Sequence, residues 1–168
     1  MNYPNVTRQL IESFAPCPAW TDTPGGYVEV YPDMDETWPD FFDLPSITDE
    51  HKVWMFTRDI PEIHSQQQAV LESFTSKYIT ENDSLLCQEV KSFHSKVLDS
   101  SSTDDDIKEI EGHVTHSEPK CENYEENYKA YRLIMCLRLG AFTGINALKD
   151  SSNYSEILMI AKNLDWGA

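Results

Sequence analysis

Between Arg8 and Lys52 the chain contains no lysine or arginine, although ten residues of that stretch are acidic. Carboxylates placed this close together repel one another, and no neighbouring base offsets the repulsion. Aromatic side chains stand among the acids of residues 33–50, notably Trp38, Phe41 and Phe42. Because buried aromatic rings stabilise a fold strongly, we expect this segment to form an ordered loop or a short helical turn held by its rings.

The excess of acids extends over the whole chain. Its 168 residues include 29 acidic and 13 basic ones, which gives a formal net charge of −16. This charge disfavours direct binding to DNA, RNA or an anionic membrane, because each of these rewards clustered Lys and Arg. It permits a basic protein surface or a cation as a partner.

Length and composition predict a single folded domain over residues 1–168. Apolar residues make up 40% and aromatic residues 11% of the chain, which is too much packing material for a disordered protein. We divide the domain into an acidic, aromatic-rich part with the strands, residues 1–58, and a helical part, residues 59–168.

The sequence predicts a cytoplasmic protein. No segment approaches the ~18 apolar residues of a membrane span, and the N-terminus lacks the charged start and apolar run of a secretory signal. The four cysteines, Cys17, Cys87, Cys121 and Cys136, show no Cys-x-x-Cys spacing. We therefore expect reduced thiols.

Two short runs predict strands. Residues 27–31 alternate apolar or aromatic side chains with a polar one, and residues 52–57 contain a continuous apolar run. Helical spacing dominates the rest: we expect helices that begin near Asp59 and Asp83, a long central helix over 124–148 and a last helix near the C-terminus. Residues 99–106, rich in Ser and Asp, predict a mobile loop.

These patterns predict an α+β fold that is predominantly helical. We expect an irregular bundle of five or six helices with a small N-terminal β-hairpin or two-stranded sheet.

The candidate partner-binding site lies in the acidic segment. Aromatic anchors with a charged rim are typical of protein interfaces. The residues that fit this pattern are Asp33, Asp35, Glu36, Trp38, Asp40, Phe41 and Asp43. Two alternatives stay open: the acids only solubilise the surface, and the aromatic rings belong to the protein's own core.

A second candidate is a metal site. His113 and His116 lie three residues apart with Cys121 nearby, and imidazole and thiolate are zinc ligands. Their spacing matches no standard zinc module, so an exposed polar loop is the competing interpretation. We find no Walker loop, dinucleotide fingerprint or nucleophile elbow, and we predict no cofactor.

The sequence therefore favours a binding protein over an enzyme. The leading hypothesis is an acidic inhibitor that neutralises a basic, nucleic-acid-handling partner, as an immunity protein or an anti-defence protein of a phage or mobile element would, by imitating the charge of DNA. One alternative is a small metal-dependent hydrolase that uses His113, His116 and Cys121. The other is a structural subunit of a larger assembly.

Overall fold

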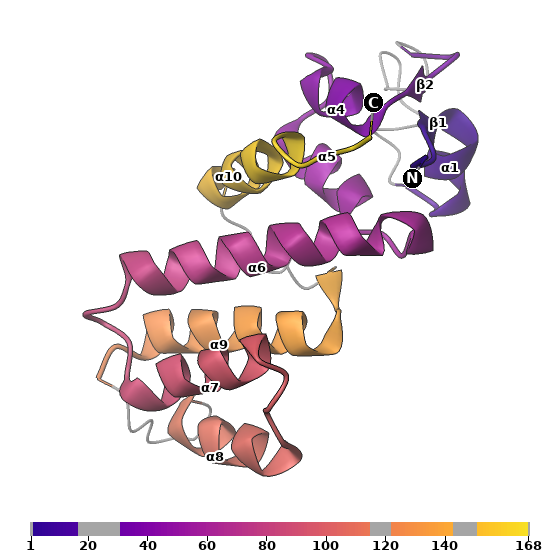
Figure 1. The fold of residues 1–168 in the computed structure, drawn as a ribbon. Coiled ribbons are helices and arrows are strands. Elements are labelled where there is room, and N and C mark those ends of the chain that lie inside the picture. Colours follow the sequence, from indigo (N-terminus) through magenta and orange to yellow (C-terminus); the bar gives the residue numbers. More distant parts are fainter. Residues whose placement is uncertain (1, 17–30, 115–121, 143–150, 168) are drawn as a thin grey trace. The chain divides into compact units, whose positions relative to one another are not determined.

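The computed structural model describes residues 2–16, 31–114, 122–142 and 151–167. These residues form eight α-helices and one two-stranded antiparallel sheet, which confirms a predominantly helical α+β fold (Figure 1). The helices outnumber the five or six that we expected, because α4 forms where we predicted an ordered loop or a short helical turn, and α5 forms where we predicted a strand.

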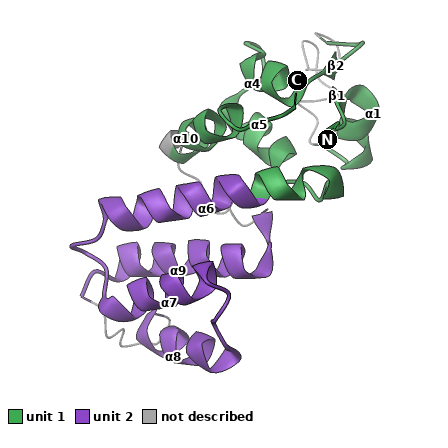
Figure 2. Ribbon diagram, in the orientation of Figure 1, with its two compact units in different colours: residues 1–67, 149–168 green, residues 68–148 purple. Residues whose placement is uncertain are grey.

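The chain divides into two compact units (Figure 2). Unit 1 comprises residues 1–67 and 149–168, and unit 2 comprises residues 68–148. The boundary falls within helix α6 (His64–Glu81), which follows a short 3-10 turn at Pro61–Ile63. Unit 1 carries fifteen acidic and five basic residues, a formal balance of −10, whereas unit 2 carries fourteen and eight, a balance of −6.

The sheet of unit 1 joins the N-terminal residues to the start of the acidic segment, residues 33–50. Strand β1 (Val6–Thr7) pairs antiparallel with β2 (Asp35–Glu36), so that Val6 faces Glu36 and Thr7 faces Asp35. Thr7 also caps helix α1 (Arg8–Ser13) by accepting a hydrogen bond from the Leu10 amide at 3.1 Å. Of the strand predicted over 27–31, residues 27–30 lie outside the described residues.

The second predicted strand, residues 52–57, is wrong: helix α5 (Asp49–Phe56) occupies this run. The side chain of Thr48 accepts a hydrogen bond from the His51 amide, and Asp49 and Glu50 place negative charge in the first turn. Both features stabilise a helix start. A short apolar run fits a buried strand and a buried helix equally well, so these start signals decide the structure.

Aromatic rings form the core of unit 1. Helix α4 (Trp38–Asp43) packs on α5, and helix α10 (Ser151–Lys162) packs on both. Trp38 lies 6.0 Å from Phe41, 5.9 Å from Phe42 and 6.0 Å from Phe56 between ring centroids, and Trp166 stacks on it at 5.8 Å. The expected short helical turn held by aromatic rings is thus confirmed.

Unit 2 is built around α9 (Tyr124–Leu139), which packs against α7 (Gln88–Leu98) and α8 (Asp104–Val114). Ala130, Ile134 and Leu137, which recur at helical spacing on one face of α9, are buried. The apolar cluster of this unit consists of Ile79, Leu86, Val90, Phe93, Ile110, Val114, Ala130, Tyr131 and Ile134.

Several predicted boundaries are wrong. Helix α9 ends at Leu139 rather than at residue 148, because Gly140 adopts φ +64°, a left-handed conformation that suits glycine and ends a helix. Residues 143–148 lie outside the described residues. Asp104, in the predicted loop over 99–106, already begins α8.

The two acids near which we expected helices to begin, Asp59 and Asp83, form contacts with side chains. Asp59 accepts a hydrogen bond from the His64 ring at 2.8 Å, and Asp83 forms an ion pair with Lys91 at 3.2 Å.

Among the described helices, none is both long and apolar enough to cross a membrane. Neither Cys87 nor Cys136 forms a disulfide in the described part of the chain, and Cys17 and Cys121 lie outside the described ranges.

A buried amide ties α9 to the connection between α6 and α7. Asn127, 1% exposed, accepts a hydrogen bond from the Cys87 amide at 2.8 Å. Its own amide group donates to the carbonyl oxygens of Leu85 and Asn123, at 3.1 and 2.8 Å. One side chain therefore satisfies three backbone groups.

We expect Asn127→Ala to lower the free energy of unfolding by about 1–3 kcal/mol, because it leaves buried backbone groups without partners. Denaturant titration followed by circular dichroism measures this loss. Asn163→Ala is the control, since Asn163 is exposed and its side chain, among the described residues, donates a hydrogen bond to the Met159 carbonyl four residues earlier. Equal effects of the two substitutions would contradict the role given to Asn127.

Candidate functional site

The candidate partner-binding residues lie on β2, on α4 and in the turn before them. Asp33, Asp35, Asp40 and Asp43 are exposed and Glu36 is half-buried. We call these five carboxylates the acidic surface. The structure thus presents every acidic residue of the predicted site to solvent, at least in part.

The two aromatic members of the predicted site lie elsewhere. Trp38 is 1% exposed and Phe41 is 0% exposed, so both rings belong to the core of unit 1. This is the arrangement that the competing interpretation of these aromatics predicted. The rings hold the backbone of α4, whose acidic residues Asp40 and Asp43 are exposed.

Basic side chains leave the acidic surface largely uncompensated. In the described part of unit 1, Arg8 pairs with Glu12 at 2.8 Å, and Arg58 lies over the Trp54 ring. Lys52 is only 6% exposed, and burial lowers its pKa despite the nearby carboxylates of Asp49 and Asp43.

The remaining described base of unit 1, Lys162, forms an ion pair with Asp43. It is the one ion pair that the acidic surface makes among the described residues. The carboxylates therefore keep most of their charge available to a partner.

Helix starts explain part of the acidity. Carboxylates in a first helical turn stabilise the helix because its N-terminus carries partial positive charge. Asp40 has this position in α4, where it also accepts a hydrogen bond from the Thr37 hydroxyl at 2.7 Å. The other such residues are Asp49, Glu50, Glu89, Asp104, Asp105, Asp106, Glu125 and Glu126.

Four carboxylates of the acidic surface have no such explanation. Asp33 lies in a turn, Asp35 and Glu36 form β2, and Asp43 is the last residue of α4. A negative charge at a helix C-terminus is unfavourable, so Asp43 weakens α4 except for its contact with Lys162. These residues are the part of the acidic surface that local stability does not require.

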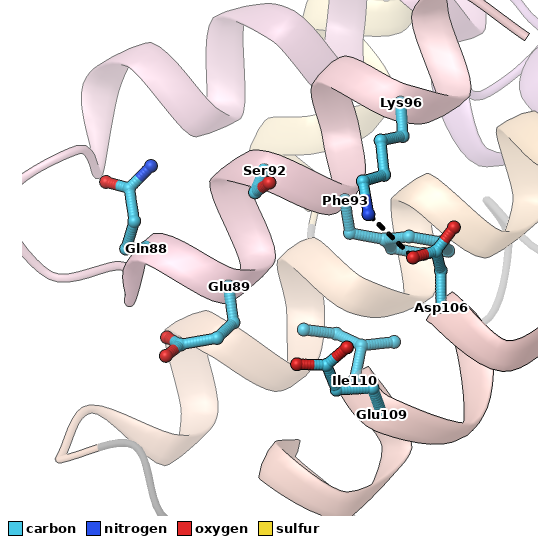
Figure 3. Close-up of a pocket in the computed structure, with 8 residues that line it drawn as sticks. All are labelled: Gln88, Glu89, Ser92, Phe93, Lys96, Asp106, Glu109 and Ile110. Carbon is cyan, nitrogen blue, oxygen red and sulfur yellow. Dashed lines mark hydrogen bonds and ion pairs between the residues drawn. The ribbon is translucent and has the colours of Figure 1, made fainter. Parts of the chain in front are cut away.

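A pocket of about 210 Å³ lies between α7 and α8 of unit 2 (Figure 3). The apolar side chains of Phe93 and Ile110 line it, and they are 3% and 2% exposed. Glu89 and Glu109 line it too, and the Lys96 ammonium contacts the Asp106 carboxylate at 2.7 Å. Sequence analysis missed this pocket because no motif indicates that these two helix faces meet.

The pocket contains a carboxylate that resists protonation. The hydrogen bond from Lys96, together with hydrogen bonds from the Thr103 amide and hydroxyl, lowers the pKa of Asp106 to about 2. Asp106 therefore stays ionised at any physiological pH and holds Lys96 in place.

The predicted metal ligands are only partly described. His113 lies near the end of α8 and is half-buried, whereas His116 and Cys121 lie outside the described residues. Among the side chains that the structure places, no group of three or more His, Cys, Asp or Glu is arranged to hold a metal ion.

Comparisons with known proteins found no relative of this chain. No family model matches the sequence, and neither the curated proteins nor the solved structures yielded a match.

The Asp106 pKa predicts a specific dependence of stability on pH. A carboxyl group whose pKa is lower in the folded than in the unfolded chain stabilises the fold above its unfolded pKa, near 3.9, and loses that effect as the pH falls toward 2. We therefore expect Asp106→Asn to lower the melting temperature at pH 6, with a difference from wild type that shrinks below pH 4.

Thermal melts between pH 2.5 and 7 measure this difference. Asp105→Asn is the matched control, because its carboxylate is exposed in the same helical turn and forms no ion pair among the described residues. A difference for Asp106→Asn that stays constant over this pH range would show that the Lys96 contact does not stabilise the fold.

Proposed function

We propose that this protein is an acidic, protein-binding inhibitor whose acidic surface neutralises a basic, nucleic-acid-handling partner. The observation that carries the proposal is the set of exposed or half-exposed carboxylates at Asp33, Asp35, Glu36 and Asp43, which no helix start requires. Unit 1 also carries the larger share of the net negative charge.

A nucleic-acid-handling protein is the partner that this charge fits best. Duplex DNA carries about one negative charge per 1.7 Å of its axis, and proteins that bind it present clustered Lys and Arg. Carboxylates on a folded surface offer such a cleft an alternative anion. Complementary charge accelerates encounter and selects the partner. A nuclease toxin and a nucleic-acid-binding host-defence protein both belong to this class.

Rigidity supports the same interpretation. The acidic surface is carried by β2 and α4, whose backbone is fixed by the buried rings of Trp38 and Phe41. A surface that is ordered before binding loses less conformational entropy when the partner arrives. The two aromatics thus contribute to binding through the backbone that they hold.

The experiment compares two triple variants in capture of a partner from a lysate of the native host at low salt. Asp33→Asn, Glu36→Gln and Asp43→Asn remove three charges from the acidic surface. Asp105→Asn, Glu122→Gln and Glu125→Gln remove three exposed charges from unit 2. Mass spectrometry identifies the retained proteins, and a salt gradient ranks them by charge dependence.

We expect wild type and the unit 2 variant to retain the same basic, nucleic-acid-binding protein. We expect the acidic-surface variant to bind it about tenfold more weakly or worse, with a flatter salt dependence, and duplex DNA to compete with wild type for it. Equal affinities of the two triple variants for the purified partner would show that the acidic surface is not the interface.

A further inference from the structure

Unit 1 contains a cavity of about 340 Å³ beside the acidic surface. Its walls come from three separate stretches of chain: the residues before β1, the start of α4 and the residues after α10. Tyr3, Trp38 and Trp166 supply aromatic rings, and Asn5 and Thr37 supply polar groups. This volume lies within the range of small-ligand pockets, which begins near 300 Å³.

The aromatic walls are fixed in place. Trp166 stacks on Trp38 with an interplanar angle of 20°, and Tyr3 meets Trp166 edge-on with centroids 5.3 Å apart. The Trp166 Nε1 group donates a hydrogen bond to the Ala161 carbonyl at 2.8 Å, which sets the orientation of the ring. Tyr3 and Trp166 are half-buried, so both keep surface that a ligand can contact.

Carboxylates stand directly behind the polar walls. The Asn5 amide donates to Asp35 at 2.8 Å, and the Thr37 hydroxyl donates to Asp40 at 2.7 Å. Among the described residues that line the cavity, none has a charged side chain. Aromatic faces and the negative charge immediately outside the cavity both attract a cation. No carboxylate has to be desolvated inside the cavity for the cation to bind there.

One buried donor beside the cavity lacks a partner. Trp38 lines the cavity and is 1% exposed, and its Nε1 group finds no acceptor in the described part of the chain. Buried polar groups are nearly always satisfied, so an unpaired donor in a residue that lines a cavity is unusual.

We propose that this cavity receives an arginine side chain of the basic partner, an inference that rests on the proposed function. A guanidinium is planar, stacks on aromatic faces and is more weakly hydrated than an ammonium, so it fits an aromatic cavity better than lysine does. Its N–H groups can donate to the Asn5 side-chain carbonyl and the Thr37 hydroxyl oxygen. The acidic surface then provides the long-range attraction, and the cavity provides the selectivity for arginine.

The test uses two acetylated peptides of equal charge, hexa-arginine and hexa-lysine, titrated into the full chain by calorimetry at 50 mM salt. We expect the wild type to bind hexa-arginine about threefold to thirtyfold more tightly, the range that cation–π contacts provide. We expect Tyr3→Ser to reduce this preference to about one while the affinity for hexa-lysine stays the same.

Two further variants keep the result interpretable. Trp166→Leu removes a larger wall and should have the same effect, with circular dichroism to confirm that the variant is folded. Tyr124→Ser is the matched control, because Tyr124 is 39% exposed, stacks on Tyr128 in unit 2 and is not one of the residues that line the cavity. Its preference for arginine should equal that of the wild type.

The outcomes separate this inference from the proposed function. If both peptides bind equally and Tyr3→Ser changes neither, the cavity does not select arginine, and the acidic surface still accounts for the binding. If neither peptide binds, both proposals fail. If an uncharged hexa-proline peptide displaces hexa-arginine and binds more tightly, the cavity recognises polyproline helices, which aromatic grooves also bind, and the arginine inference is overturned.

Discussion

The packing of aromatic rings around Trp38 is the interaction on which unit 1 depends. Trp38, Phe42, Phe56 and Trp166 lie within 5.7–6.2 Å of one another, and they come from α4, α5 and the end of the chain. Each ring buries a large apolar area, and each pair adds about 0.5–1.5 kcal/mol. This packing offsets the repulsion among the carboxylates that surround it, and it links sequence segments more than one hundred residues apart.

The same packing fixes the positions of the carboxylates on the acidic surface. Carboxylates in a disordered chain form no fixed pattern, whereas those on β2 and α4 keep their spacing because buried rings hold the backbone beneath them. Local stability requires only some of them: Asp40 supports the start of α4, but Asp43 opposes the dipole at its end. The proposed binding surface would account for an acid at a position where the helix is more stable with a base.

The sequence predicts helical content and the aromatic anchoring of residues 33–50 well, because both depend on local spacing. The sequence-based prediction is wrong at residues 52–57, because their apolar side chains fit a strand or a helix equally well. The N-cap at Thr48 favours the helix. The prediction also fails at Gly140, which ends α9 within a continuing apolar stripe. The exposed carboxylates could be predicted, but the cavity could not, since Tyr3, Trp38 and Trp166 meet only through the fold.

The most direct test of this account is amide hydrogen exchange across residues 33–56. The Phe41 amide donates to the Thr37 carbonyl at 2.8 Å, and the Lys52 amide donates to the Thr48 carbonyl at 3.0 Å. If buried rings hold the acidic segment in place, both amides exchange far more slowly than in a free peptide and at a rate similar to the amides of α10. Exchange at free-peptide rates over 38–43, with α10 protected, would show that α4 is not anchored and would contradict a preformed acidic surface.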